Sequence, residues 1–195
     1  TGVLADVQRD AISKGMVWLN SAGNHAGATG EGGYWRSAWI DVDLDGWLGF
    51  GGVTELMAVS CGFFQGLRWN DWGSNRTDYD IYIFEDLTQA SFFNPNDPST
   101  FKASSLLDQA AGADPVESPD WACSSGDFDY VAITRFGGGS SNGDVLEIAI
   151  NNSQIQFSSN PFSAGQPFSD SNVAGALSVG AVDPALGTSI GSYSS

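Results

Sequence analysis

The chain has 195 residues, and its hydrophobic fraction of 42%, with seven Trp, twelve Phe and five Tyr, is enough to fill a packed core, so wholesale disorder is excluded. Its formal net charge of −16 repels phosphate backbones and anionic membranes, which argues against nucleic-acid and membrane partners. No apolar stretch approaches the roughly 20 residues that span a bilayer.

The first residues predict a helix followed by a short strand. Residues 3–14 place apolar side chains at helical spacing, with charged residues on the other faces. Gly15 suits the position just after a helix, and residues 16–19 form an apolar run typical of a buried strand. Together they indicate an α/β unit, in which functional groups follow the carboxyl ends of strands.

From residue 27 to residue 170 the pattern changes to short β-like runs separated by clusters of Gly, Asn, Asp, Ser and Pro. The runs cover residues 56–60, 63–69, 78–84, 130–136, 145–150 and 155–157. Only residues 102–111 offer a helical pattern in this block. The spacing predicts a mainly β fold, an antiparallel β-sandwich or jelly roll.

A continuous apolar strand returns at residues 176–182. The β-rich block therefore lies between two short α/β pieces, and we interpret it as an inserted domain, because exposed loops between core elements tolerate insertions. The predicted organisation is a core segment over residues 1–26, the insert over 27–170 and a second core segment over 171–195.

Two stretches resemble core strands of the subtilisin-like serine proteases, or subtilases. Residues 17–24, Val-Trp-Leu-Asn-Ser-Ala-Gly-Asn, are similar to the strand that ends in the oxyanion-hole Asn. Residues 177–183, Leu-Ser-Val-Gly-Ala-Val-Asp, are similar to a later core strand. By this resemblance Asn24 donates its side-chain amide to the oxyanion of the tetrahedral intermediate. The resemblance implies a secreted serine endopeptidase acting on protein or peptide substrates.

The insert carries a resemblance of its own. Residues 69–72, Trp-Asn-Asp-Trp, and residues 78–83, Asp-Tyr-Asp-Ile-Tyr-Ile, are similar to β-sandwiches found in secreted bacterial proteases. Beside the oxyanion Asn, such a sandwich would restrict access to the cleft or bind large protein substrates.

The chain departs from the subtilase pattern by lacking a catalytic triad. The subtilase triad runs Asp, His, Ser, yet no Asp or His segment precedes residue 21 and no Gly-Thr-Ser-Met-Ala motif follows residue 183. His25 lies on the wrong side of Asn24 to be the base, and residues 187–191, a G-x-S-x-G match, have no Asp or His after them. We therefore expect a piece of a longer exported protein that is inactive alone.

The sequence Asp41-Val-Asp43-Leu-Asp45-Gly46 matches the start of a calcium loop. An EF-hand requires Glu at the twelfth position, where this chain has Gly52, and Glu55 comes three residues later. Two interpretations stay open: a partial calcium site formed by Asp41, Asp43, Asp45 and Glu55, or an acidic turn without a ligand.

Two interpretations also stay open for the two cysteines. Cys61 and Cys123 either pair in an oxidising compartment or remain free thiols, and with one His they are too few for a structural zinc site. A bridge between them would stabilise the fold by roughly 4 kcal/mol on the chain-entropy model.

A second function class competes with the protease. The block could be a noncatalytic β-sandwich module that binds calcium or carbohydrate, since six Trp residues lie between positions 35 and 121 and exposed indoles stack on sugar rings. The alternative is that these Trp residues pack in the hydrophobic core.

Overall fold

The structure, a computed structural model, describes residues 3–21, 33–52, 54–123, 128–151, 155–156 and 173–180. Its helices are α1 (Val3–Ser13), α2 (Leu87–Ser91) and the 3-10 helix η1 (Pro98–Thr100). Its strands are β1 (Trp18–Ser21), β2 (Tyr34–Ala38), β3 (Met57–Val59), β4 (Phe63–Trp69), β5 (Thr77–Phe84), β6 (Ala103–Ser105), β7 (Val116–Glu117), β8 (Asp129–Gly138), β9 (Val145–Asn151), β10 (Ile155–Gln156) and β11 (Ala176–Val179).

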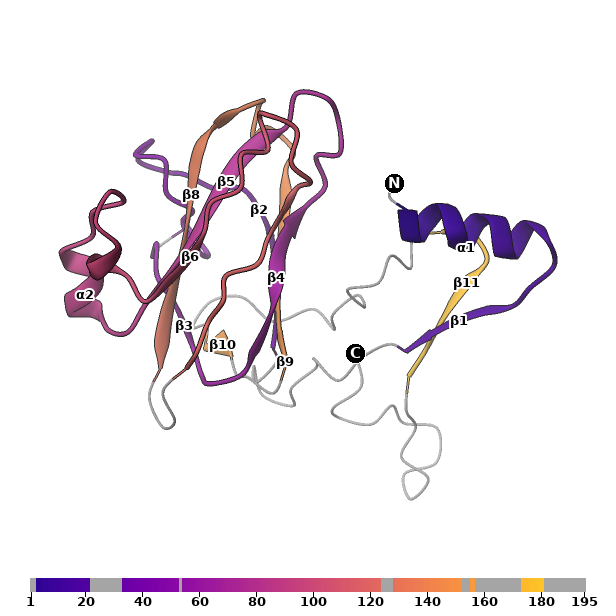
Figure 1. The fold of residues 1–195 in the computed structure, drawn as a ribbon, viewed down its shortest axis with the longest axis horizontal. Coiled ribbons are helices and arrows are strands. Elements are labelled where there is room, and N and C mark those ends of the chain that lie inside the picture. Colours follow the sequence, from indigo (N-terminus) through magenta and orange to yellow (C-terminus); the bar gives the residue numbers. More distant parts are fainter. Residues whose placement is uncertain are drawn as a thin grey trace, which may run out of the picture.

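Nine of these strands form two antiparallel sheets (Figure 1). One sheet has the order β10-β3-β8-β5-β6, and the other has the order β2-β9-β4-β7. Side chains of both sheets share one buried core, for example Trp35 and Ile148 from the second sheet with Ile81 and Ile133 from the first. The predicted mainly β fold with antiparallel sheets is thus confirmed, and the sheets pack as a sandwich.

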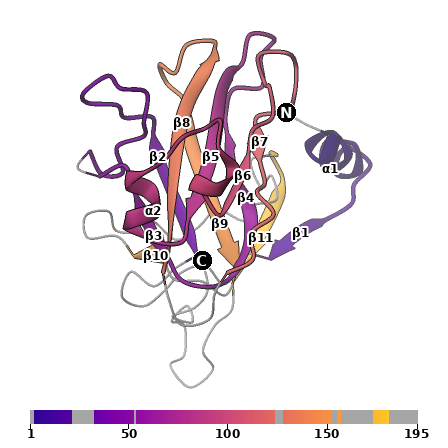
Figure 2. The same ribbon diagram turned by 60° about the vertical axis from the view of Figure 1, so that its left-hand side comes forward.

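Strand β5 is buried along its whole length because both of its faces are covered. Tyr79, Ile81 and Ile83 enter the main core, as the alternation of the sequence predicts. Tyr82 and Phe84 point the other way, into a second cluster made largely of aromatic rings. Helix α2 lies on this outer side of the five-stranded sheet, opposite the four-stranded sheet (Figures 1 and 2).

The expected helix at residues 102–111 is wrong. Strand β6 occupies its beginning and pairs with β5, and a turn follows in which the N–H of Ala111 donates to Asp108 Oδ1 at 2.7 Å. Gly112 has φ 110°, a conformation that favours glycine. The Asp side chain gives the backbone an alternative to helical hydrogen bonds, which explains the failure of the helical pattern.

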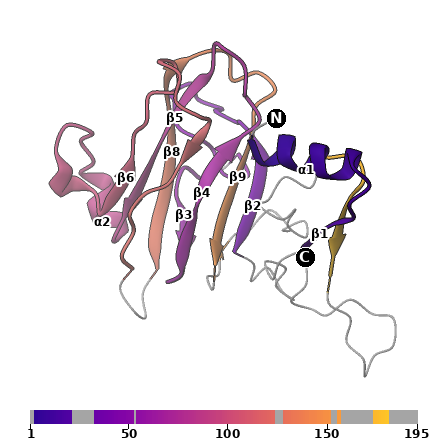
Figure 3. The same ribbon diagram turned by 45° about the vertical axis from the view of Figure 1, so that its right-hand side comes forward.

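The remaining strands, β1 and β11, form a separate two-stranded sheet beside the sandwich (Figures 1 and 3). They are parallel, with Trp18 opposite Ala176 and Ser21 opposite Val179. Helix α1 precedes β1 and contacts it, and the chain leaves the helix through Gly15 at φ 81°. A helix, glycine and strand in this order agree with the predicted α/β unit, although the strand begins at Trp18 instead of Met16. The expectation that this strand is buried is wrong, because the side chains of Met16, Val17 and Leu19 are exposed.

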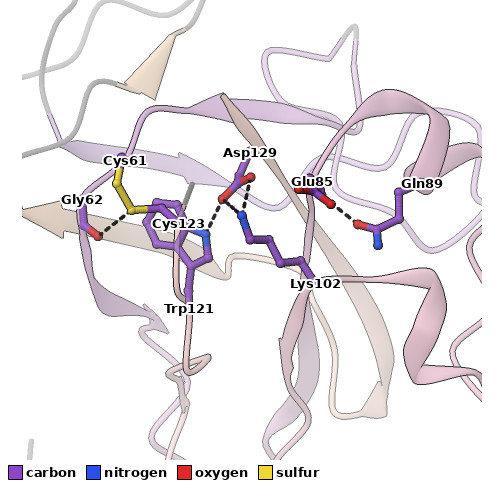
Figure 4. A network of polar contacts seen from close by, with 8 residues as sticks. All are labelled: Cys61, Gly62, Glu85, Gln89, Lys102, Trp121, Cys123 and Asp129. Carbon is purple, nitrogen blue, oxygen red and sulfur yellow. Dashed lines mark hydrogen bonds and ion pairs between the residues drawn. A yellow bond between two sulfur atoms is a disulfide. The ribbon is translucent and has the colours of Figure 1, made fainter. Parts of the chain in front are cut away.

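A buried ion pair ties Asp129, at the start of β8, to Lys102, just before β6, and Trp121 from the segment before β8 joins it. Asp129 is buried and accepts hydrogen bonds from Lys102 Nζ at 2.9 and 3.0 Å and from Trp121 Nε1 at 2.5 Å. Figure 4 shows the carboxylate between these two donors, near the disulfide. Because every contact of this carboxylate is charge-assisted, removing it leaves the donors without the group they share.

We expect Asp129→Ala to lower the free energy of unfolding by about 3–5 kcal/mol, because removing one member of a buried ion pair is strongly destabilising. Equilibrium urea unfolding measures this change. Asp120→Ala, at an exposed position of the same segment, is the control and should change it by less than about 0.5 kcal/mol. Equal effects of the two substitutions would contradict a structural role for the pair.

Candidate functional site

The carboxyl end of β1 is where the sequence places its catalytic candidate. In a parallel pair both strands end at the same edge of the sheet, so Ser21 and Val179 lie side by side. Within β1, Trp18 Nε1 donates to Asn20 Oδ1 at 2.9 Å. Asn24 and His25 lie outside the described residues, as do residues 187–191.

The structure brings together the three acidic residues of the predicted calcium loop. Carboxylate oxygens of Asp41, Asp43 and Asp45 lie within 4.8 Å of one another. The turn is made possible by Leu44 at φ 64° and Gly46 at φ 91°. Asp41 Oδ2 accepts from the Gly46 N–H at 3.1 Å, whereas Asp41 Oδ1 is shielded from solvent and has no hydrogen-bond partner among the described residues.

Hydrogen bonds to a backbone carbonyl hold this acidic loop, residues 41–46, against the sandwich. The carbonyl of Gly46 accepts from the N–H of Arg135 at 2.9 Å and from Thr134 Oγ1 at 3.0 Å. Immediately after the loop, Leu48 and Phe50 are fully buried in the core. The loop therefore has a fixed position on β8, which pre-organises its carboxylates.

Glu55 lies in the segment that follows the acidic loop and interacts with its charges. The backbone N–H of Phe50 donates to the carbonyl of Thr54 at 2.6 Å, and this bond turns the chain back toward the loop. Partial burial raises the pKa of Glu55, and the charges of Asp45, Asp43 and Asp41 raise it further. Of the four predicted metal-ligating residues, the structure brings the carboxylates of Asp41, Asp43 and Asp45 together within 4.8 Å, and Glu55 is not part of that group.

Cys61 and Cys123 form a disulfide with a Cα–Cα distance of 5.3 Å. It joins the turn before β4 to the segment that follows β7, two places 62 residues apart in sequence (Figure 4). The bond closes a long loop and so restricts the unfolded chain.

Replacing both cysteines, Cys61→Ser with Cys123→Ser, should lower the free energy of unfolding by up to about 4 kcal/mol because the loop constraint is lost. Urea unfolding with and without dithiothreitol measures this: reductant should destabilise the wild type and leave the double variant unchanged. A wild type that unfolds identically in reductant would contradict the expectation.

The structure also buries acidic residues that the sequence analysis did not single out as site residues. Asp78, Asp80 and Glu117 are buried, although acidic residues in strands more often cap edges. Burial and the neighbouring carboxylates Asp78, Glu117 and Asp108 raise the pKa of Asp80 to about 7. The signal in the sequence was the placement of Asp at alternate positions in an otherwise apolar strand.

Comparisons with protein-family models, with curated proteins and with solved structures found no match to this chain. Among the described helices none has the length and apolar character needed to cross a membrane.

Proposed function

We propose that this chain is part of a secreted subtilisin-like serine endopeptidase whose catalytic core is interrupted by the β-sandwich. In this proposal Asn24 is the oxyanion donor, the Asp, His and Ser of the triad come from other segments of the protein, and this chain alone is inactive. The sandwich controls access to the cleft or binds the protein substrate.

The parallel pairing of β1 with β11 is the observation that supports the proposal most. These are the two stretches that resemble subtilase strands, and they pair although the whole sandwich lies between them in sequence. Parallel strands need a crossover connection, which here contains the sandwich. The Cys61–Cys123 disulfide also suits an exported protein, because disulfides persist in oxidising compartments.

The test begins with the complete gene. The proposal requires an Asp segment and a Gly-His-Gly-Thr-His-type segment before this chain and a Gly-Thr-Ser-Met-Ala-type segment after it. A gene that lacks them overturns the protease proposal.

In the full-length enzyme, Asn24→Ala should reduce kcat by about 10²–10³ with little change in KM, because the lost donor acts on the transition state; loss of the subtilisin donor has an effect of this size. Hydrolysis of a small peptide substrate measures it. Asn142→Ala, at an exposed position of the sandwich, is the matched control and should leave kcat unchanged. A kcat for Asn24→Ala within threefold of the wild type would remove Asn24 from the mechanism.

We propose calcium binding at the acidic loop as a second function, which does not depend on the first. The support is the convergence of Asp41, Asp43 and Asp45 on one another and the approach of Glu55. Carboxylate oxygens are ligands that Ca²⁺ prefers, and bound calcium would neutralise the repulsion among them.

Calcium should raise the melting temperature of the chain relative to chelator, since a ligand held only by the folded state stabilises it by about 2.7 kcal/mol at 100 times its Kd. Differential scanning calorimetry with millimolar CaCl₂ or EDTA measures the shift. The variant Asp43→Asn with Asp45→Asn should bind one calcium ion fewer per chain, as counted by equilibrium dialysis. An unchanged count would exclude the loop as a calcium site.

A further inference from the structure

The turn that joins β8 to β9 contains an asparagine followed by a glycine, Asn142-Gly143. No other asparagine of the sequence precedes a glycine. Both residues are exposed, and apart from its neighbours in the chain nothing lies within 4 Å of the position that a Cβ atom on Gly143 would take. The pair therefore has open space around it.

Two groups of this pair that can react with each other have no hydrogen-bond partner among the described residues. They are the backbone N–H of Gly143 and the side-chain amide of Asn142. On either side, the Asn142 N–H donates to Ser140 Oγ at 3.3 Å and the Asp144 N–H donates to the Ser141 carbonyl at 3.1 Å. The turn is thus held around Gly143, while the nitrogen of Gly143, which has no side chain to shield it, stays accessible.

The acidic loop contains a similar pair, Asp45-Gly46, in which the corresponding groups are held. The Gly46 N–H donates to Asp41 Oδ2 at 3.1 Å, and Asp45 Oδ1 accepts from the Trp47 N–H at 3.0 Å. The Gly46 carbonyl also accepts from the Arg135 N–H at 2.9 Å. The Gly46 nitrogen cannot approach the Asp45 side chain without breaking such bonds, so this pair serves as an internal comparison.

We propose that Asn142 is a site of spontaneous covalent modification. The Gly143 nitrogen bonds to Asn142 Cγ, the Cγ–Nδ2 bond breaks, and ammonia leaves with the proton of the Gly143 N–H, so that a cyclic imide joins the two residues. Water then opens the ring at either carbonyl, which gives an aspartate or an isoaspartate. The sequence of steps needs only water, and asparagine is among the thermolabile residues. The site does not depend on the protease or the calcium proposal.

The isoaspartate product disturbs the hydrogen bonds that fix this turn. Asn70, directly after β4, donates from Nδ2 to the Gly143 carbonyl at 3.3 Å and accepts at Oδ1 from the Val145 N–H at 2.8 Å. Between these two residues, the buried Asp144 accepts from the Tyr79 hydroxyl at 2.9 Å. An isoaspartyl linkage adds one methylene to the main chain directly before Gly143, so we expect at least one of the two Asn70 bonds to be lost.

The experiment incubates the full 195-residue chain in mildly alkaline buffer. Peptides from timed samples are analysed by mass spectrometry and with an enzyme that methylates isoaspartate. The peptide that contains Asn142 should lose its amide at a rate within tenfold of the rate in the chain unfolded by guanidinium chloride, because the folded turn does not hold the reacting groups. Asn142→Gln should remove the modification. Asn75→Gln, at another exposed asparagine, is the matched control and should leave the rate unchanged.

A folded-state rate more than tenfold below the unfolded-state rate overturns the proposal, because the turn would then protect Asn142. Folding should slow isoaspartate formation at Asp45 at least tenfold more than at Asn142, and a smaller difference also overturns it.

The effect on the turn is measured separately. The isoaspartyl fraction, isolated by ion-exchange chromatography, should unfold at a lower denaturant concentration than the variant Asn142→Asp, which carries the same charge on a normal backbone. Equal midpoints would overturn the proposed loss of the Asn70 bonds.

Discussion

The parallel pairing of β1 with β11 is the constraint on which the organisation of the chain depends. A parallel pair cannot be closed by a tight turn, so the segment between the strands must leave one end of the pair and return to the other. Here that segment contains both sheets of the sandwich. Both ends of the β-rich segment must therefore connect to one small sheet.

Within the sandwich, strand β5 is the constrained element, because both of its faces are buried. One of its faces supplies Tyr79, Ile81 and Ile83 to the main core, and the other changes along its length from Asp78 and Asp80 to the aromatic Tyr82 and Phe84. The apolar half packs without electrostatic cost. In the acidic half, Asp78 accepts a hydrogen bond from the Gln109 N–H in the turn between β6 and β7. Burial and neighbouring carboxylates raise the pKa of Asp80.

The sequence predicted the strands whose patterns are local. The run at residues 63–69 matches β4, and 78–84 differs from β5 by one residue, because alternation and flanking turn residues mark both ends. The sequence did not predict strand β2 at Tyr34–Ala38, because this strand is defined by its pairing with β9, far along the chain. Residues 102–111 failed because an Asp side chain closes a turn where the apolar spacing suggested a helix.

The same distinction separates the two acidic groups. Alternate Asp residues followed by a Gly mark the acidic loop within six positions, and the structure brings the three Asp carboxylates together. The buried acids Asp78, Asp80 and Glu117 come from β5 and β7, so no single local motif indicates them. The two groups also differ in how strongly solvent screens the repulsion between their charges. Water can screen the acidic loop, whereas the interior carboxylates repel one another with little screening. A chain with a net charge of −16 can keep most of its acids on the surface at little cost, but burial penalises the charged form, which is why the pKa of Asp80 rises to about 7.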